Sequence, residues 1–295
     1  MMPRVLRWTP SDLTGPWRFA ELSTGATRFE VGGPPGGPPV LLVHGLTYPL
    51  EVWTFLHHHL AASGHRVVRY DLPGRGLSAF DGQALTLAAL AAHALEVLEV
   101  AEVRGPCALV SMSNADLVLA QLATQAPERV ASLVCVAPSG LDPRTVNTAT
   151  RLLRLFPPLQ RWSEAALRRR TGRRIEGHRA QLEEGASAEA RAVYDVALRT
   201  VRESPAFGPA VLSQLAHAGG AAALEATVSA CARMDRPVTF VDFRGDRDSQ
   251  AMGVQVFRDQ LPRARWVTLD GDHMGLVQRP APVNAAVERA VSDAR

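Results

Sequence analysis

The feature that most constrains the fold is an alternation of short apolar runs with segments whose apolar residues recur at helical spacing, such as Leu85–Val100. Strands that alternate with helices pair in parallel, because each helix carries the chain back across one face of the sheet. The run Val40–Val43 is apolar throughout, which is typical of a strand covered on both faces. The sequence therefore predicts an α/β fold with a mostly parallel, twisted sheet of about eight strands and helices on both faces. The predicted strands are Arg18–Leu22, Thr27–Val31, Val40–Val43, Arg66–Tyr70, Cys107–Val110, Val130–Val136, Pro237–Phe243 and Arg265–Leu269.

The alternation stops after Pro138. From Asp142 to Ser204 the chain is rich in Arg and Ala, has helical spacing and contains no strand-like run. We expect an inserted helical cap over residues 141–204, with residues 1–140 and 205–295 forming the core domain. The segment Phe207–Met234 is expected to be a helix or a helix pair, with its weak point at Gly219–Gly220, because glycine is unfavourable inside a helix.

Composition excludes several classes of protein. Hydrophobic residues make up 46% and charged residues 21% of the chain, as in an ordinary globular protein. No apolar run is long enough to span a bilayer, and the first residues lack the apolar core of a secretory signal, so we expect a cytoplasmic protein without stable membrane insertion. The three cysteines lie far apart, which favours buried free thiols. The basic run Arg168–Arg174 lacks interleaved aromatics, so we expect a solvated helix face and no nucleic-acid partner.

The stretch Cys107–Asp116 passes from an apolar strand into a helix within a few residues. Such an abrupt reversal can hold a serine hydroxyl at the tip of the turn when the flanking residues are small. Here Ser113 stands at the turn, between Ser111 and Ala115. The usual pattern has glycine at both flanking positions, so this version is degenerate. Ser113 is nevertheless the candidate nucleophile, and Ser111 is a rival that falls at a small-residue position.

Polar residues follow the last two predicted strands. Asp246 and Asp248 follow one of them, and His273 follows the other. Because ligands bind beyond the carboxyl ends of the strands in an open parallel sheet, we expect these side chains to meet Ser113 at one edge. The order Ser, Asp, His along the chain is the order that accompanies a serine turn of this kind. Asp248 is the favoured acid because of its spacing after Gly245, and Asp246 is the second choice.

The chemistry explains why these residue types are needed together. A serine hydroxyl needs a base to take its proton, and a histidine has a suitable pKa near neutral pH. A carboxylate behind the histidine fixes its tautomer and stabilises the imidazolium. Two backbone N–H groups must stabilise the oxyanion that forms. We expect the N–H of Asn114, directly after Ser113, and that of Leu46, which follows His44–Gly45.

With these signals, the chain resembles the α/β-hydrolase superfamily from Val40 to the final helix, and in particular its bacterial esterase-like and lipase-like members. The resemblance implies the fold of that family, with a helical cap inserted into the core. No single motif is decisive, but all of them occur in the expected order. The motifs are His44–Trp53, Asp71–Ser78, the turn at Ser113, Pro127–Val130, Gly245–Asp248 and Gly271–His273 with Pro280 downstream.

Other histidines have simpler interpretations. The triplet His57–His59 is expected to form a helix face, since no second ligand cluster accompanies it. His44 is expected to support the oxyanion loop by hydrogen bonding. The loop Gly74–Gly76 lacks the Lys-Ser/Thr of a phosphate-binding loop, which favours a tight turn beside the site.

The expected function is that of a serine hydrolase cleaving an acyl bond, with a carboxylic ester as the first choice, in a small-molecule apolar acyl substrate, without a metal or an organic cofactor. A thioesterase, a lactonase and a carbon–carbon bond hydrolase of the same fold are the alternatives within enzymes. A non-catalytic ligand-binding protein is the alternative outside them. Packing of the cap's own core is an equally good interpretation of its apolar residues. The candidate pocket residues are His44, Tyr48, Trp53, Leu152, Phe156, Trp162 and Met274.

Overall fold

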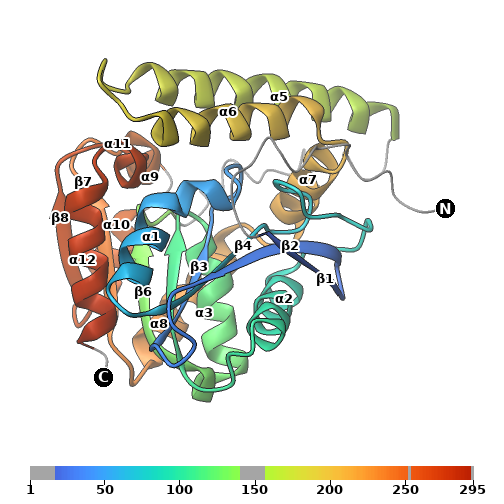
Figure 1. Ribbon diagram of the computed structural model, residues 1–295. Coiled ribbons are helices and arrows are strands. Elements are labelled where there is room, and N and C mark those ends of the chain that lie inside the picture. The colour runs from blue at the N-terminus through green and yellow to red at the C-terminus, as the bar shows by residue number, and fades with distance from the viewer. Residues whose placement is uncertain (1–16, 140–156, 252–253, 294–295) are drawn as a thin grey trace.

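The computed structural model describes residues 17–139, 157–251 and 254–293. Its centre is an eight-stranded sheet with the order β1-β2-β4-β3-β5-β6-β7-β8 (Figure 1). The pairs from β4 to β8 are parallel, and β1 and β2 join one edge in antiparallel register. The predicted fold class is therefore confirmed. The strands are β1 (Arg18–Leu22), β2 (Gly25–Gly32), β3 (Pro39–Val43), β4 (Arg66–Tyr70), β5 (Cys107–Met112), β6 (Val130–Val136), β7 (Val238–Phe243) and β8 (Arg265–Leu269).

Helices cover both faces of the sheet, so its central strands bury side chains in two directions. In β3, Leu41 and Val43 face one buried cluster, whereas Val40 and Leu42 face the other. This alternation explains why the run is apolar throughout. The helices are α1 (Thr54–Ala62), α2 (Leu87–Val100), α3 (Ala115–Gln125), α5 (Pro157–Ala180), α6 (Ala188–Glu203), α7 (Phe207–His217), α8 (Ala221–Arg233), α9 (Arg247–Ala251), α10 (Val254–Gln260), α11 (Gly275–Gln278) and α12 (Pro280–Ser292), with 3-10 turns η2 (Leu50–Trp53) and η3 (Pro127–Arg129).

The helices α5 and α6 form a layer of their own across one end of the core (Figure 1). The hydroxyl of Ser187 caps α6 by accepting a hydrogen bond from the N–H of Ala190 at 3.1 Å. On one side α6 buries an apolar stripe that includes Tyr194 and Val201. The start of the expected cap, residues 141–156, lies outside the described residues, so the predicted domain boundaries stay a prediction.

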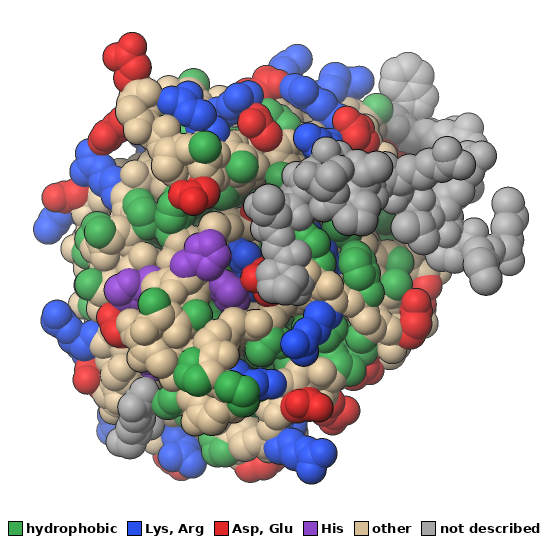
Figure 2. Space-filling view, in the orientation of Figure 1, with side chains coloured by type: hydrophobic (Ala, Val, Ile, Leu, Met, Phe, Trp, Pro, Cys, Tyr) green, Lys and Arg blue, Asp and Glu red, His purple; other side chains and the backbone are tan. Residues whose placement is uncertain are grey.

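The expected break after α7 is present. Helix α7 ends at His217 and α8 begins at Ala221, with Gly220 between them at φ +105°. Cys107, Cys135 and Cys231 are buried and free, as expected. Among the helices that the structure describes, none is both long enough and apolar enough to cross a membrane. On the face shown in Figure 2, acidic and basic side chains intermingle and form no large patch of one sign.

Candidate active site

The turn between β5 and α3 holds Ser113 in a strained conformation. Its φ is +56°, in the left-handed region that residues other than glycine rarely adopt. The Ser113 N–H donates to the carbonyl of Val136 at 2.9 Å, which fixes the turn against the neighbouring strand. Ser111 and Ala115 are both buried beside it. Strain of this kind costs on the order of 1–3 kcal/mol and collects at functional sites, so the geometry supports the choice of Ser113 over Ser111.

The loop after β3 approaches this turn closely. A Cβ atom added to Gly45 would lie 3.0 Å from Cβ of Ser113 and 3.2 Å from the carbonyl oxygen of Met112. Only glycine allows such an approach without a shift of the backbone. The approach brings Gly45 and Leu46 of this loop to the same pocket as Ser113.

His44 fixes the orientation of that loop. Its Nε2 accepts a hydrogen bond from the N–H of Leu72 at 2.9 Å, so Nδ1 carries the proton and donates to the carbonyl of Gly45 at 2.7 Å. In a trans peptide the C=O and N–H point in opposite directions, so this bond leaves the Leu46 N–H on the edge away from His44. Burial lowers the pKa of His44 to about 3, which keeps the imidazole neutral.

We predict that Gly45→Ala lowers kcat by about 100-fold, because the added methyl group pushes the loop and its N–H donor away from Ser113. Steady-state kinetics on a p-nitrophenyl ester check this. Gly36→Ala is the matched control, since a Cβ atom there meets nothing within 4 Å. A Gly45→Ala enzyme as active as the control would show that the close approach is not needed.

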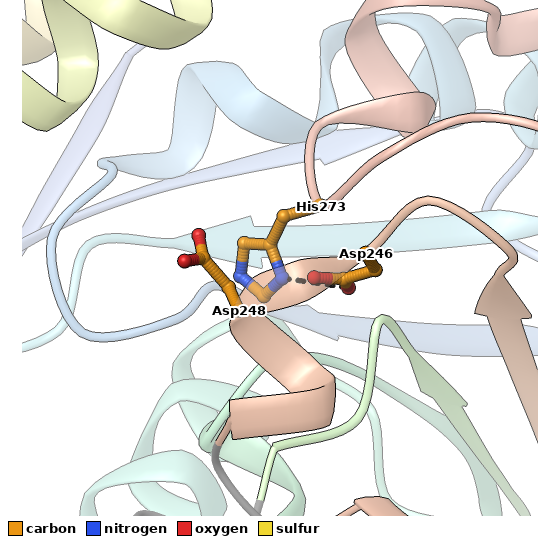
Figure 3. A group of neighbouring side chains, drawn as sticks. All are labelled: Asp246, Asp248 and His273. Atoms are coloured by element: carbon orange, nitrogen blue, oxygen red, sulfur yellow. Dashed lines mark hydrogen bonds and ion pairs between the residues drawn. The ribbon is translucent and has the colours of Figure 1, made fainter.

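His273 and Asp246 form a buried pair at the ends of β8 and β7. The His273 Nδ1 lies 2.9 Å from Oδ2 of Asp246, as Figure 3 shows. Backbone bonds from Gly245 N–H to the carbonyl of Gly271, at 2.9 Å, hold the two loops together. Asp246 also accepts from the N–H of Ser249 at 2.9 Å and from its hydroxyl at 2.6 Å. Burial by itself would raise the pKa of Asp246, but the hydrogen bond and charge of His273, followed by the two hydrogen bonds from Ser249, outweigh it and lower the pKa.

The structure corrects the expected choice of acid. Asp246, the second choice from the sequence, is the carboxylate on Nδ1 of His273. Asp248 lies in the first turn of α9, and Figure 3 shows it on the side of the ring away from Asp246. The reason is the direction of the chain: Asp246 falls in the turn directly after β7 and is buried, whereas Asp248 is turned toward the cap with 34% of its side chain exposed.

Asp248 instead binds the cap. Its Oδ2 lies 2.5 Å from a guanidinium nitrogen of Arg174 and 3.5 Å from Nε2 of His178, both on α5. Together the two side chains keep the pKa of Asp248 below its usual range. The hydrogen bond from His178 has the largest effect, and the charge of Arg174 adds to it. The Nδ1 of His178 lies 2.9 Å from the hydroxyl of Tyr48, and its ring centroid is 6.5 Å from that of His273.

Arg174 thus belongs to the site, although the basic run that contains it was expected to be a solvated helix face. Arg169, Arg170 and Arg173 are exposed as expected, and so is Arg174, with 39% of its side chain exposed although it pairs with Asp248. Arg168 reaches inward and donates to the carbonyl of Val201 at 2.5 Å. Helical spacing alone cannot show which arginines of such a run face the core, because that depends on where α5 is placed over the sheet.

A pocket lies between the turn at Ser113, the loop after β3 and the cap residue Arg174. Ser113 and His273 both line it, together with the two residues expected to form the oxyanion hole. Among the described residues, the Ser113 hydroxyl bonds to Ser139 at 2.9 Å rather than to His273. Ser139 follows β6, and its N–H donates to the buried carboxylate of Asp116 at 3.1 Å. Its place at the end of a strand is the one signal in the sequence that could have indicated it. The lining residues are Gly45, Leu46, Thr47, Tyr48, Met112, Ser113, Asn114, Ser139, Arg174 and His273.

The remaining pocket predictions have mixed outcomes. Tyr48 lines the pocket, but His44, Trp53 and Met274 are fully buried behind it and do not. Trp53 ends the 3-10 turn η2, and its side chain packs in the buried cluster that also contains Val40 and Leu42. Leu152 and Phe156 lie outside the described residues, and so does the side chain of Trp162 on α5.

The site offers a possible group of metal ligands. Asp246, Asp248 and His273 can present atoms that all lie within 4.8 Å of one another. The charge of Asp248 is already balanced by Arg174, and the oxygens of Asp246 accept hydrogen bonds from Ser249 and His273. We therefore assign these residues to hydrogen bonding and ion pairing rather than to a metal.

A positive-φ serine at a strand–helix turn and a buried His–Asp pair beyond neighbouring strands are typical of hydrolytic enzymes with this sheet. The chain belongs to the alpha/beta hydrolase family, whose model matches residues 40–286. It is 41% identical over 113 residues to the dihydrolipoyllysine-residue acetyltransferase component of an acetoin cleaving system from Pseudomonas putida, and 39% identical over 111 residues to the putative carbamate hydrolase RutD of Variovorax paradoxus. These matches cover 38% and 37% of this chain, and 30% and 41% of the two relatives.

Solved structures of bacterial hydrolases share the fold over most of the chain. A thermophilic esterase from Thermogutta terrifontis superposes with a TM-score of 0.73 at 19% identity, covering 94% of this chain and 99% of that one. At this identity the likeness establishes the fold alone.

Proposed function

We propose that this protein is a serine hydrolase that cleaves a carboxylic ester through an acyl-enzyme. The observation that carries the proposal is that Ser113, held at φ +56°, lines the same pocket as His273, whose Nδ1 is engaged by a buried carboxylate. A hydroxyl, an imidazole and a carboxylate are the parts that nucleophilic catalysis needs.

In the proposed reaction the Ser113 hydroxyl leaves Ser139 and turns to Nε2 of His273. His273 takes its proton as Oγ attacks the ester carbonyl, and the carbonyl π electrons move onto oxygen. The imidazolium then returns the proton to the leaving alcohol as the carbon–oxygen bond breaks. Asp246 accepts the Nδ1–H throughout and stabilises the positive charge. Water activated by His273 later cleaves the acyl-enzyme and restores Ser113.

The N–H groups of Leu46 and Asn114 are the proposed oxyanion donors. Both residues line the pocket beside Ser113, and Asn114 follows it at the start of α3. The positive end of the α3 dipole adds to the stabilisation of a developing negative charge.

The acyl group is proposed to be small and largely apolar. Leu46, Tyr48 and Met112 supply apolar lining, and the cap closes the pocket with Arg174. A thioester or a lactone presents the same acyl carbonyl to Ser113, so these substrates are the alternatives within the proposal.

The test is hydrolysis of a panel of p-nitrophenyl esters of rising acyl length, with a thioester and a lactone as comparisons. Turnover with a preference for short acyl chains is expected. A fluorophosphonate probe should modify one serine, and peptide mass spectrometry should place the label on Ser113. A protein that hydrolyses none of these substrates and takes up no probe would instead be a non-catalytic ligand-binding member of the family.

A further inference from the structure

Arg75 is an arginine with no exposed surface, in the loop after β4, close to the proposed oxyanion hole. Burying a charge is costly unless other groups compensate for it, and an unpaired one therefore calls for an explanation. Burial lowers the pKa of Arg75 to about 9, so the guanidinium is still charged at neutral pH.

The guanidinium donates to neutral oxygens only. Its Nε bonds to the carbonyl of Leu46 at 3.0 Å, and Nη1 bonds to the carbonyl of Pro73 at 2.6 Å. Its Nη2 donates to the side-chain oxygen of Gln214, a buried residue of α7. Each of the three nitrogens thus has a hydrogen-bond acceptor, but these bonds do not neutralise the charge.

Other buried arginines nearby are compensated in a different way. Arg28 forms ion pairs with Asp71 at 2.6 Å and Glu51 at 2.8 Å, and Arg69 pairs with Glu30 at 2.7 Å. In the part of the chain that the structure describes, no carboxylate pairs with Arg75. Its positive charge is therefore not neutralised by a directly bonded carboxylate, and water does not screen it at this buried position.

The Leu46 residue connects Arg75 to the site. The peptide that carries the Leu46 N–H is held by His44 through the Gly45 carbonyl, and the next peptide is held by Arg75 through the Leu46 carbonyl. Each of the two peptides that flank the Leu46 Cα is thus anchored by a buried side chain. The positive charge of Arg75 also lowers the pKa of His44, which shows that the two side chains lie close together.

We infer that Arg75 is a positioning residue for the oxyanion hole, which fixes Leu46 and places behind it a positive charge that no bonded carboxylate neutralises. The inference rests on the proposed function. A hydrogen bond holds the donor before and after the reaction, whereas the charge stabilises the oxyanion only once it forms. Such a group raises kcat and has little effect on ground-state binding.

Three variants separate the anchor from the charge. Arg75→Met removes both and is expected to lower kcat by about 30- to 100-fold, with KM changed by less than about threefold. Gln214→Glu keeps Arg75 and its hydrogen bonds but adds a negative charge beside it, so kcat should fall by about tenfold. Arg75→Lys should recover part of the loss, because it keeps the charge. Inhibition by a trifluoromethyl ketone, whose adduct with Ser113 carries an oxyanion, should weaken by the same factors as kcat.

Arg129→Met is the control, since Arg129 also binds a carbonyl, that of Val103 at 2.6 Å, but from the end of η3 and not in the pocket lining. Rates are expressed per serine labelled by a fluorophosphonate, which removes misfolded protein from the comparison. Wild-type kcat in Gln214→Glu, or an equal loss in Arg129→Met, would overturn the inference; if Arg75→Met fails to fold, Gln214→Glu decides alone. A wild type that neither hydrolyses esters nor takes up the label would overturn the proposed function instead.

Discussion

Replacing Ser113 with alanine should lower kcat on a p-nitrophenyl ester by about 10⁶-fold, because loss of the nucleophile removes the covalent route altogether. The residual rate should stay above that of water, since the oxyanion donors remain. Cβ of alanine keeps the position of the serine Cβ, so the turn and the contact with Gly45 are retained. Steady-state kinetics measure the loss of activity. Thermal unfolding of the variant and the wild type shows whether the fold is retained.

The control for this experiment is Ser111→Ala. Ser111 is the other serine of the turn and is fully buried; its hydroxyl donates to the carbonyl of Val134 at 3.5 Å and also bonds to the thiol of Cys135. The variant should keep most of the activity and take up the fluorophosphonate. The opposite outcome, an inactive Ser111→Ala and an active Ser113→Ala, would show that Ser111 is the nucleophile. The positive φ of Ser113 would then not mark a catalytic residue.

The second large effect is expected for Asp246→Asn, with a fall in kcat of about 10⁴-fold. An amide at this position turns an N–H toward Nδ1 of His273, which then keeps its proton on Nε2 and cannot accept one from Ser113. Asparagine has nearly the same shape as aspartate, so the loop after β7 should be preserved. Steady-state measurements of kcat over a range of pH give the size of the loss.

Asp248→Asn is the matched variant, because it makes the same chemical change two residues away. Asp248 binds Arg174 and His178 of the cap, so its loss should alter KM more than kcat, and kcat should fall by less than about tenfold. If Asp248→Asn were the inactive enzyme and Asp246→Asn the active one, the carboxylate that the sequence favoured would be the catalytic acid. Equal losses in both would indicate that the pair acts together on His273.

The sequence by itself determined the fold class and several elements to the residue. The strands Arg18–Leu22, Arg66–Tyr70, Val130–Val136 and Arg265–Leu269 are the same in prediction and structure, because short strand-like runs bounded by turn residues have few other solutions. The sequence also indicated that Ser113 and His273 belong to one site, because the carboxyl ends of parallel strands lie at the same edge of a sheet.

Only the tertiary structure decided how the neighbours of these residues are arranged. Asp246 and Asp248 are two residues apart, and the direction in which the chain turns into α9 determines which one reaches His273. Arg174 reached the site only through the placement of α5 over the sheet, and Ser139 through the turn after β6. Arg75 belongs to a motif that the sequence showed, but its lack of a counter-charge depends on which side chains pack around it. Spacing along a chain determines periodicity and order, whereas contacts between segments far apart depend on side-chain directions that no local pattern contains.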